Sequence, residues 1–441
     1  MRNIASAVKM IALVVCCIIL FNACAMFDLF SVDELMRTPK LTGENALIQQ
    51  VFEEAVGTGV SLMNPVSGEY RSAYVLNDID GDSHDEAIVF YKNNQTASDI
   101  HMHLLDFDGR EWFSVADVVG NGTDIYSIEF CNLDQGNLSE IAVVWTMPDA
   151  ARSKNLSIYK ISTEKNIVKK LSSLGTFPVF DYLFVDLDFD GLNEMFYIYY
   201  DNTVQPQHAA ARVMEIDAEK EIIKPSSELK FKSDVVSFAG LTSDLKDGTY
   251  RMYIDCIAAN SEYFTQIVFY DAEKSTLMTP SFLSDATNIK KTTRKSGVLS
   301  QDINSDHLIE IPVEKDYPSS AVINLPGDTQ AQIKMLEWLR LSQNELQSIG
   351  KYYRNTYDGF TMSIDSFYEY SYIIYDYETH TTQFRLKNFD EEENLLFSIV
   401  FLTYSDGENA YKTPTYTVKI TQLGDSMDIS PSFVKEQIEL N

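Results

Sequence analysis

An acidic stretch of nine residues, from Asp78 to Glu86, offers the clearest chemistry in the sequence. Its first, third, fifth and ninth residues are acidic, so their side chains can converge on one point if the chain turns tightly. The backbone carbonyl of the seventh residue, His84, can join them. Oxygen ligands of this kind suit Ca²⁺, which takes about six to eight of them in a flexible geometry. The stretch therefore predicts a calcium-binding loop.

The same order of ligand types returns twice further along the chain, at residues 186–194 and 302–310. Aspartate and glycine also gather in ordinary exposed turns, which is the simpler explanation for any one such loop. Three loops with one ligand order favour metal binding instead. The predicted calcium ligands, with carbonyls from His84, Leu192 and Leu308, are Asp78, Asp80, Asp82, His84, Glu86, Asp186, Asp188, Asp190, Leu192, Glu194, Asp302, Asn304, Asp306, Leu308 and Glu310.

Two weaker copies of the loop are also present. Residues 132–140 keep Asn132, Asp134 and Glu140, but Gly136 stands at the fifth position. This copy is therefore expected to bind calcium weakly or not at all. A more damaged copy at residues 244–248 is expected to bind none.

The loops are expected to lie between β-strands. An EF-hand calcium loop closes with a glutamate at position twelve and is flanked by helices. Here the glutamate is ninth, and the β-rich run Ala87–Tyr91 follows it at once. The third position of successive loops falls at Asp80, Asp134 and Asp188, 54 residues apart each time. A repeat of about this length, with four strand-like runs per unit, is typical of a β-propeller blade.

The acidic loops, with the run from Ser67 to Ala73 that leads into them, resemble FG-GAP or VCBS-type repeats, which also occur in the head of integrin α-chains. The whole chain is similar to a group of lipoproteins of Gram-positive bacteria that carry such repeats and have no established activity. The resemblance is good over about residues 40–360. It implies a β-propeller in which Asp-rich loops linking two strands hold Ca²⁺.

The predicted fold class is an all-β propeller of about five four-stranded blades over residues 58–354, with the calcium loops between blades. The strand Glu69–Leu76 would complete the last blade and close the ring. Six or seven blades result if the C-terminal region adds blades without loops. An open array or a pair of sandwiches explains the same short strands and is the alternative architecture.

The N-terminal segment predicts export. An uncharged run of about a dozen residues is too short to cross a bilayer core of about 30 Å, which favours a lipoprotein signal peptide over residues 1–23. The run ends in the sequence FNAC, which resembles a lipobox, so Cys24 is the expected site of lipidation. Plain secretion with Cys24 unmodified is the alternative. A tether at residues 24–40 and a helix at residues 41–57 that packs on the main domain are expected to follow.

The C-terminal residues 355–441 are expected to form a small α+β domain, with a short terminal helix at residues 430–440. Tyr368, Tyr370 and Tyr372 alternate along one expected strand and so share a face. An exposed row of tyrosines can stack on sugar rings or contact a partner. The simpler explanation is that these rings cover the core of a sheet.

Composition narrows the functions further. The formal net charge is −30 and the isoelectric point is about 4.5, so nucleic acid is not an expected partner, and any membrane attachment rests on the lipid. Cys131 and Cys256 lie in apolar, strand-like runs and are expected to be buried free thiols. His101 and His103 alternate along an expected strand and could share a face, which would supply half of a metal site. The simpler explanation is a strand face that is packed or solvated. The sequence contains no serine-hydrolase elbow, phosphate loop or zinc-protease motif.

These observations predict an exported, calcium-stabilised β-propeller anchored by lipid to the outer face of the cell membrane. It would act as a monomeric binding or scaffold module for a surface protein or a glycan, since propellers present loops on a rigid frame. The alternative is a propeller enzyme acting on glycans or lipids, which a pocket lined with carboxylates or with His101 and His103 would favour. A third hypothesis is a structural envelope factor without a small ligand.

Overall fold

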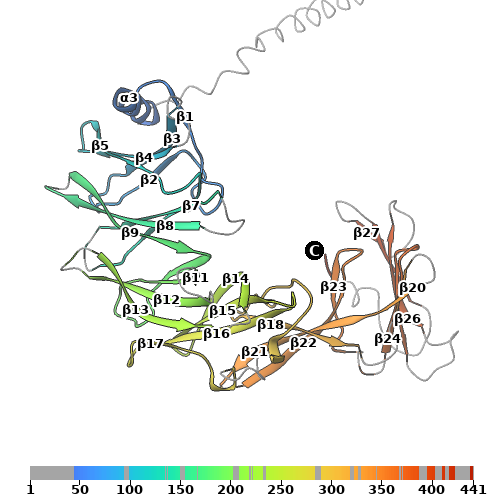
Figure 1. Cartoon of the computed structure of the whole chain (residues 1–441). Coiled ribbons are helices and arrows are strands. Elements are labelled where there is room, and N and C mark those ends of the chain that lie inside the picture. The colour runs from blue at the N-terminus through green and yellow to red at the C-terminus, as the bar shows by residue number, and fades with distance from the viewer. Residues whose placement is uncertain are drawn as a thin grey trace, which may run out of the picture. The chain divides into compact units, whose positions relative to one another are not determined.

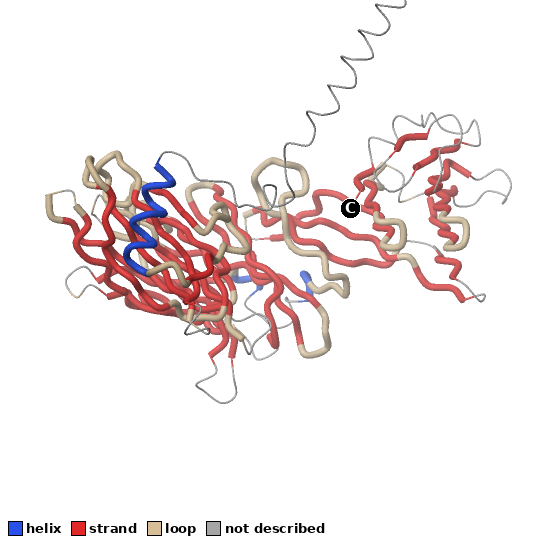
Figure 2. The backbone as a smooth tube through the Cα atoms, turned by 90° about the horizontal axis from the view of Figure 1, so that it is seen from above, coloured by secondary structure: helices blue, strands red, loops and turns tan. Residues whose placement is uncertain are grey.

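Strands account for almost all of the regular structure in the computed structural model of the protein (Figure 1, Figure 2). The α-helix among the described residues is α3 (Glu44–Val56). No helix in that part of the chain is long and apolar enough to cross a membrane. The structure describes residues 44–440 except 94–98, 135, 137, 149–153, 166, 202–207, 218–219, 221, 232–234, 284–289, 318–321, 326–328, 344, 367–368, 370, 387–394, 403–409, 413–416 and 423–437.

The chain forms two compact units, which are described separately. The first comprises the residues up to Asn64 together with Ser72–Gly120 and Ser162–Leu171. The second comprises Pro65–Arg71, Asn121–Ile161 and Ser172–Asn441. The first acidic loop belongs to the first unit, and the remaining acidic loops belong to the second.

In the first unit, α3 covers one face of an antiparallel sheet (Figure 1). Ile48 and Phe52, one helical turn apart, point from α3 into a core that includes Val89 and Leu105. Gly109, at φ +83°, lies in the hairpin turn between the last two strands of this sheet. The sheet contains β1 (Val60–Leu62), β3 (Glu86–Asn93), β4 (Ile100–Phe107) and β5 (Trp112–Val119) in that order, and β2 (Tyr74–Asn77) also pairs with β3.

Three four-stranded antiparallel sheets follow along the chain. Each is built from four consecutive strands, so every connection within a sheet is local. This succession confirms the predicted all-β class and is consistent with propeller-like blades. The strands are β6 (Asp124–Cys131), β7 (Glu140–Thr146), β8 (Lys154–Thr163) and β9 (Val168–Val179), then β10 (Asp181–Val185), β11 (Glu194–Asp201), β12 (His208–Asp217) and β13 (Ile222–Lys230), then β14 (Val235–Lys246), β15 (Thr249–Ala258), β16 (Tyr263–Asp271) and β17 (Thr276–Met278).

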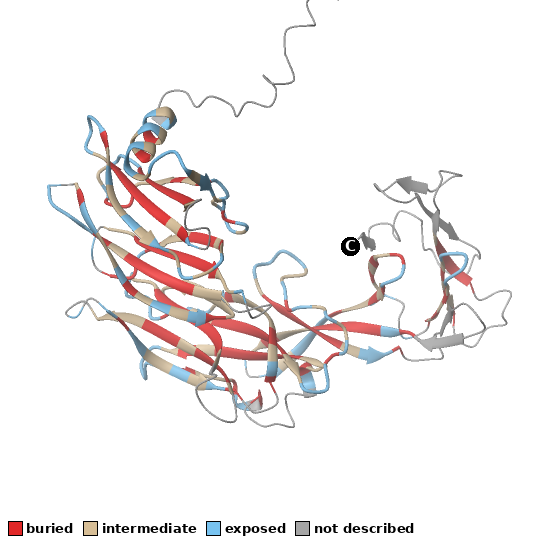
Figure 3. Ribbon diagram, turned by 45° about the horizontal axis from the view of Figure 1, so that its top comes forward, coloured by how far each residue is buried: buried red, intermediate tan, exposed pale blue. Residues whose placement is uncertain are grey.

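The central strands of these sheets are buried on both faces (Figure 3). In β7, Ile141 to Trp145 are all fully buried, although successive side chains point to opposite faces. One core joins Val144 of β7 to Tyr197 of β11, and the next joins Ile198 of β11 to Ile254 of β15. The sheets therefore stack face to face, which explains why their strands are continuous apolar runs.

Two larger sheets complete the chain, and they differ from the predicted α+β domain. The described residues beyond Asn355 form strands, and Ile438–Leu440 pair with Phe360–Met362 where the sequence predicted the end of a helix. Pairing at a sheet edge satisfies the backbone groups that a helix would have satisfied internally. One sheet contains β18 (Glu310–Asp316), β21 (Lys334–Ser342), β22 (Glu345–Asn355), β23 (Phe360–Ser363) and β29 (Ile438–Leu440), and the other contains β20 (Thr329–Gln332), β19 (Val322–Leu325), β24 (Ser371–Asp376), β25 (Thr381–Leu386), β26 (Leu395–Leu402), β28 (Thr417–Gln422) and β27 (Ala410–Lys412).

The sequence predicted that the acidic loops run between blades, and this prediction is wrong for the first loop and for residues 186–194. β2 pairs with β3 across residues 78–86, and β10 pairs with β11 across residues 186–194. Each loop therefore connects neighbouring antiparallel strands of one sheet. The physical reason is that a loop closed by hydrogen bonds between its own ends brings the flanking strands side by side, whatever their order in the repeat.

Candidate metal sites

Three acidic loops share one backbone template. The first residue's carboxylate accepts the N–H of the sixth residue, and the ninth residue's carboxylate accepts the N–H of the second. Each loop is thus closed by its own acidic side chains. The sixth-to-first bonds are Ser83–Asp78 (3.0 Å), Gly191–Asp186 (2.9 Å) and His307–Asp302 (2.7 Å), and the second-to-ninth bonds are Ile79–Glu86 (2.7 Å), Leu187–Glu194 (2.7 Å) and Ile303–Glu310 (3.1 Å).

The template also fixes the backbone angles. The fourth and sixth residues of each loop have positive φ, a region in which glycine meets no steric penalty. The first two loops place a glycine at one of these positions, Gly81 at φ 77° and Gly191 at φ 94°. In the third loop both positions are non-glycine, Ser305 at φ 59° and His307 at φ 65°.

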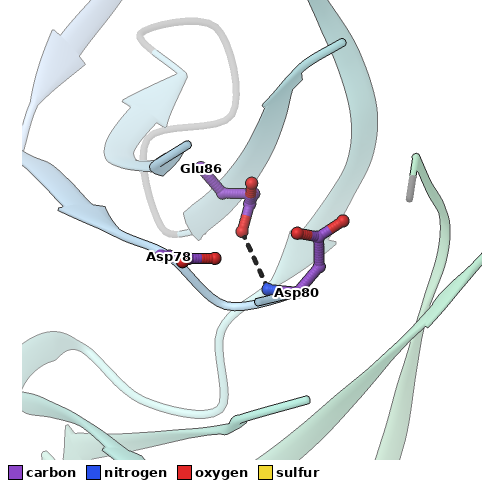
Figure 4. Close-up of side chains that lie close together, drawn as sticks. All are labelled: Asp78, Asp80 and Glu86. Carbon is purple, nitrogen blue, oxygen red and sulfur yellow. Dashed lines mark hydrogen bonds between the residues drawn. The ribbon is translucent and has the colours of Figure 1, made fainter. Parts of the chain in front are cut away.

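The first loop brings its acidic groups together. Carboxylate oxygens of Asp78, Asp80 and Glu86 lie within 4.8 Å of one another (Figure 4). Glu86 is fully buried and Asp80 is 9% exposed. Asp80 Oδ2 and Glu86 Oε1 are buried and accept no hydrogen bond. A buried carboxylate oxygen without a donor is costly, and a bound cation would satisfy both of these atoms.

The other two predicted ligands of the first loop lie at its rim. Asp82 Oδ1 accepts the N–H of His84 at 2.8 Å. The imidazole of His84 is exposed, and its Nδ1 lies 3.2 Å from the same Asp82 oxygen. Asp82 is therefore near the cluster and orients the backbone of the seventh position.

Asp106, in β4, is a further acid at this site that the sequence analysis did not identify. Its side chain is buried, and its Oδ2 accepts the N–H of Val168 at 2.7 Å. Its Oδ1 is buried without a hydrogen-bond donor, as is Glu86 Oε1. The signal in the sequence was the position of Asp106 near the end of the second strand after the loop, 20 residues beyond Glu86.

Burial and mutual repulsion raise the pKa values of these carboxyl groups. Burial, followed by repulsion from Asp82, raises the pKa of Asp80 to about 6. Burial, with the nearby charges of Asp80 and Asp106, raises the pKa of Glu86 to about 8. Burial also raises the pKa of Asp106. Without a cation, Glu86 therefore favours its protonated form at neutral pH, and a metal ion must displace that proton.

The loop at residues 186–194 forms a second cluster. Carboxylate oxygens of Asp186, Asp188 and Glu194 lie within 4.8 Å of one another. Burial, with repulsion from the loop's aspartates, raises the pKa of Glu194 to about 7. Asp190 Oδ1 accepts the N–H of Leu192 at 2.9 Å, as Asp82 does for His84 in the first loop.

The loop at residues 302–310 has the same backbone hydrogen bonds, but a basic side chain contacts its acids. Arg340, from β21, donates from Nε to Glu310 Oε1 at 2.6 Å and from Nη2 to Asp306 Oδ2 at 2.7 Å. Partial burial opposes its charge, but these bonds raise the pKa of Arg340 above its usual value. Of the ligands predicted for this loop, Asp306 and Glu310 therefore contact a guanidinium group. Asp302 accepts the N–H of His307, Asn304 accepts the N–H of Asp306, and Leu308 donates its N–H to Asp306.

The two weaker copies also carry basic partners. At residues 132–140, Lys160 forms an ion pair with Asp134 Oδ2, while Glu140 Oε1 is buried without a donor. At residues 244–248, Arg251 and Asp244 form a buried ion pair across a tight hairpin. Among the described residues, the groups that gather three acids at metal-binding distances are those of the first loop and of residues 186–194. Oxygen-only donor sets of this kind suit Ca²⁺ or Mg²⁺.

His101 and His103 do share a strand face, as predicted, and a carboxylate joins them. The carboxylate of Asp117, in β5, accepts a hydrogen bond from the hydroxyl of Tyr91 at 2.9 Å. It also lies 2.8 Å from His101 Nδ1 and 3.1 Å from His103 Nδ1. Ser114 Oγ lies 3.0 Å from His103 Nε2. This network links three strands beneath α3, but within the described part of the chain it does not gather three metal-ligand atoms within 4.8 Å of one another.

The remaining predicted sites are resolved in part. Tyr372 lies in β24 and is half-buried, whereas Tyr368 and Tyr370 lie outside the described residues. Cys24 also lies outside them. Cys131 and Cys256 are buried free thiols, as predicted.

One cavity bears on the enzyme alternative. It has a volume of about 670 Å³, lies in the second unit, and is lined by Lys246, Asp247, Arg251, Phe269 and eight other residues. Asp247 is the one acidic residue in that lining, and no histidine contributes to it. This cavity therefore lacks the convergent carboxylates or histidines that would favour the alternative.

Comparison with known proteins relates the chain to solved structures of low sequence identity. No protein-family model and no curated protein sequence matches it. Among solved structures, it is similar to an exo-β-1,3-galactanase from Phanerochaete chrysosporium in complex with β-1,3-galactotriose, at 10% identity and a TM-score of 0.29, over 80% of this chain and 81% of that one. It is also similar to a glycoside hydrolase at 8% identity and a TM-score of 0.22, over 70% of this chain and 94% of that one.

Proposed function

We propose that the protein is an exported, lipid-anchored β-propeller of the FG-GAP or VCBS type, stabilised by Ca²⁺, that acts as a binding or scaffold module at the cell surface. The observation that carries the calcium assignment is the pair of buried, unpartnered oxygens, Asp80 Oδ2 and Glu86 Oε1, within one acidic cluster. The succession of four-stranded antiparallel sheets supports the propeller architecture.

The ion would brace the fold rather than carry out chemistry. Residues 78–86 connect β2 to β3, and residues 186–194 connect β10 to β11, so each site lies at the start of a central strand. A divalent cation would remove the repulsion among carboxylates that are held together by the backbone template. The free energy of binding would then add to the free energy of unfolding.

The calcium assignment is tested by a metal count and by thermal unfolding. We expect about two Ca²⁺ per purified chain, one for each acidic cluster. Binding to the folded state at a hundredfold excess over Kd stabilises by about 2.7 kcal/mol per site, so chelation should lower the unfolding midpoint clearly. No bound metal and no effect of chelator would overturn the assignment.

The anchoring assignment needs its own experiment. Cells expressing the full chain should incorporate a clickable palmitate analogue, and Cys24→Ala should abolish labelling and release the protein from the membrane fraction. Ser67→Ala is a control outside the signal segment. Equal labelling of the Cys24→Ala chain would reject Cys24 as the lipidated residue.

A second candidate function, an esterase acting on lipids or acylated glycans, is favoured by the order of groups around His103. Ser114 Oγ, His103 and Asp117 follow one another in the hydrogen-bond order of an acyl-transfer triad. A register shift leaves Val115 unpaired between Ser114 and Ala116, and such a bulge re-aims side chains so that Ser114 and Asp117 reach one face. Ser114 is exposed to solvent.

In that reaction, Ser114 Oγ would attack the ester carbonyl while His103 Nε2 takes its proton. The bond from the acyl carbon to the alcohol oxygen would break, and His103 would return the proton to the leaving alcohol; water would then hydrolyse the acyl-serine. A fluorophosphonate probe tests this directly. Labelling that requires Ser114 and is lost in His103→Gln would support the esterase, and the absence of labelling on the native chain would exclude it.

A further inference from the structure

The closing glutamate of each loop leaves one carboxylate oxygen for a cation. In four loops its Oε2 accepts the N–H of the loop's second residue, which leaves Oε1 for another partner. The glutamates are Glu86, Glu140, Glu194 and Glu310, with N–H···Oε2 distances of 2.7, 2.7, 2.7 and 3.1 Å.

Strand register then places one residue opposite each of these glutamates. Glu310 pairs directly with Arg340. In the other sheets the register of the ladder, continued by one residue, places a single residue opposite each glutamate. The ladders end at Ala87–Leu105, Ile141–Tyr159 and Met195–Met214, so the opposite residues are Asp106 for Glu86, Lys160 for Glu140 and Glu215 for Glu194. Directly opposite residues share a face of the sheet, with Cβ atoms about 5 Å apart.

The charge of this opposite residue sorts the loops into two kinds. The opposite residue is acidic at the two loops that gather three acids: Asp106 at the first loop and Glu215 at residues 186–194. It is basic at the other two, where Lys160 pairs with Asp134 and Arg340 pairs with Glu310. The loop backbone does not explain this division, because residues 302–310 repeat the hydrogen bonds of residues 78–86.

The number of acids follows the same division. At the predicted ligand positions, the first loop and its opposite residue supply five carboxylates, and so do residues 186–194 with Glu215. The loop at residues 302–310 supplies three acids and residues 132–140 supply two, each with one basic residue. The five-acid sets are Asp78, Asp80, Asp82, Glu86 and Asp106, and Asp186, Asp188, Asp190, Glu194 and Glu215.

We propose that the residue opposite the closing glutamate determines how each loop is neutralised: an acid completes a site for a divalent cation, and a lysine or arginine takes the cation's place. The chain would therefore bind Ca²⁺ at two loops and carry a built-in cation at two. Arg340 illustrates the replacement, because it contacts both Asp306 at the fifth position and Glu310 at the ninth, two of the ligands predicted for the ion. The inference rests on the proposed calcium function of residues 78–86 and 186–194.

The experiment exchanges the charge at this position in both directions. Arg340→Glu should bind one Ca²⁺ more than the wild-type chain, and Asp106→Lys should bind one fewer. The matched controls are Lys334→Glu, which makes the same change of charge on strand β21, and Glu111→Lys, which makes the same change of charge at an exposed position of the first unit. Both controls should keep the wild-type count by plasma mass spectrometry.

Unfolding provides a second readout. Chelator should lower the unfolding midpoint of Asp106→Lys less than that of the wild type, because the lysine supplies the positive charge that the ion supplied. The wild-type count separates the two proposals. No bound ion would overturn the calcium function, whereas three or four ions in the wild-type chain would overturn this inference and leave the calcium function standing. If the wild-type chain binds two ions and both Arg340→Glu and Asp106→Lys also bind two, this inference would be overturned as well.

Discussion

Glu86 and Asp106 lie on neighbouring strands of one sheet, and each has a buried carboxylate oxygen without a hydrogen-bond donor. Burial raises the pKa of both groups. Two such acids in one place are destabilising when ionised, and either protons or a cation must neutralise them. The stability of the first unit should therefore depend on calcium and on pH, and both dependences can be measured.

The substitution Glu86→Gln isolates the charge of the closing residue. Glutamine keeps an acceptor for the N–H of Ile79, so the loop should stay closed. We expect the loss of one bound Ca²⁺ and, at a hundredfold excess over Kd, of about 2.7 kcal/mol of calcium-dependent stability. In chelator at neutral pH the variant should be about as stable as the wild type, because glutamine, like the protonated Glu86, carries no charge. Calorimetry with Glu111→Gln as the exposed control checks this, and an unchanged metal count would contradict it.

The metal-free protein should become less stable as pH rises. Burial holds the pKa of Asp80 at about 6, of Glu194 at about 7 and of Glu86 at about 8, all above their usual values. Acids with raised folded-state pKa values contribute stability below their unfolded values and lose it as pH rises through the folded ones. In chelator, the midpoint temperature of unfolding should decrease as the pH is raised from about 4 to about 8. Excess Ca²⁺ should remove most of this decrease. A midpoint in chelator that rises over this range would contradict the assignment.

Calcium binding should also release protons near neutral pH. At about pH 6.5 the folded, metal-free protein should hold protons on Glu86 and Glu194 that the ion must displace. Calcium titrations by calorimetry in buffers of different ionisation enthalpy should therefore give different apparent enthalpies. Identical enthalpies in all buffers would show that these carboxyl groups are already ionised.

The buried ion pair of Arg294 and Asp255 should be sensitive to the loss of one partner. The Nη2 of Arg294 lies 2.7 Å from Asp255 Oδ1, and both side chains are buried. Arg294→Met would leave a buried carboxylate without its charge partner, at a cost of about 3–5 kcal/mol. Urea unfolding should show this loss, whereas Arg110→Met at an exposed position should show little. The double variant with Asp255→Asn should recover part of the stability.

Gly122 should not tolerate a side chain. A Cβ at this position would lie 2.6 Å from the carbonyl oxygen of Thr146 and 2.6 Å from Trp145 Cβ, and backbone cannot move aside cheaply. Gly122→Ala should lower the free energy of unfolding by about 1–3 kcal/mol through overpacking. Gly59→Ala, where a Cβ meets nothing within 4 Å, is the matched control. Equal unfolding midpoints for the two variants would contradict the prediction.

The sequence by itself determined the acidic loops and the all-β class. The ligand order from Asp78 to Glu86 is a local pattern, because residues one to nine of a tight turn can meet only one another. The same holds for the apolar runs that follow each loop, whose length and β-branched content predict central strands such as β7. The buried thiols Cys131 and Cys256 were predicted for the same reason, since their neighbours are apolar.

Only the tertiary structure decided which residue faces each closing glutamate and which strands the loops join. Arg340 lies 30 residues beyond Glu310, with β19 and β20 between them, whereas Lys160 lies 20 residues beyond Glu140. No local pattern specifies these distances, because they depend on the length of each hairpin and on the register of the two strands. A shift of register by one residue would turn the opposite side chain to the other face of the sheet. Sequence therefore identified the acidic loops, and strand pairing determined whether an acidic or a basic residue lies opposite each closing glutamate.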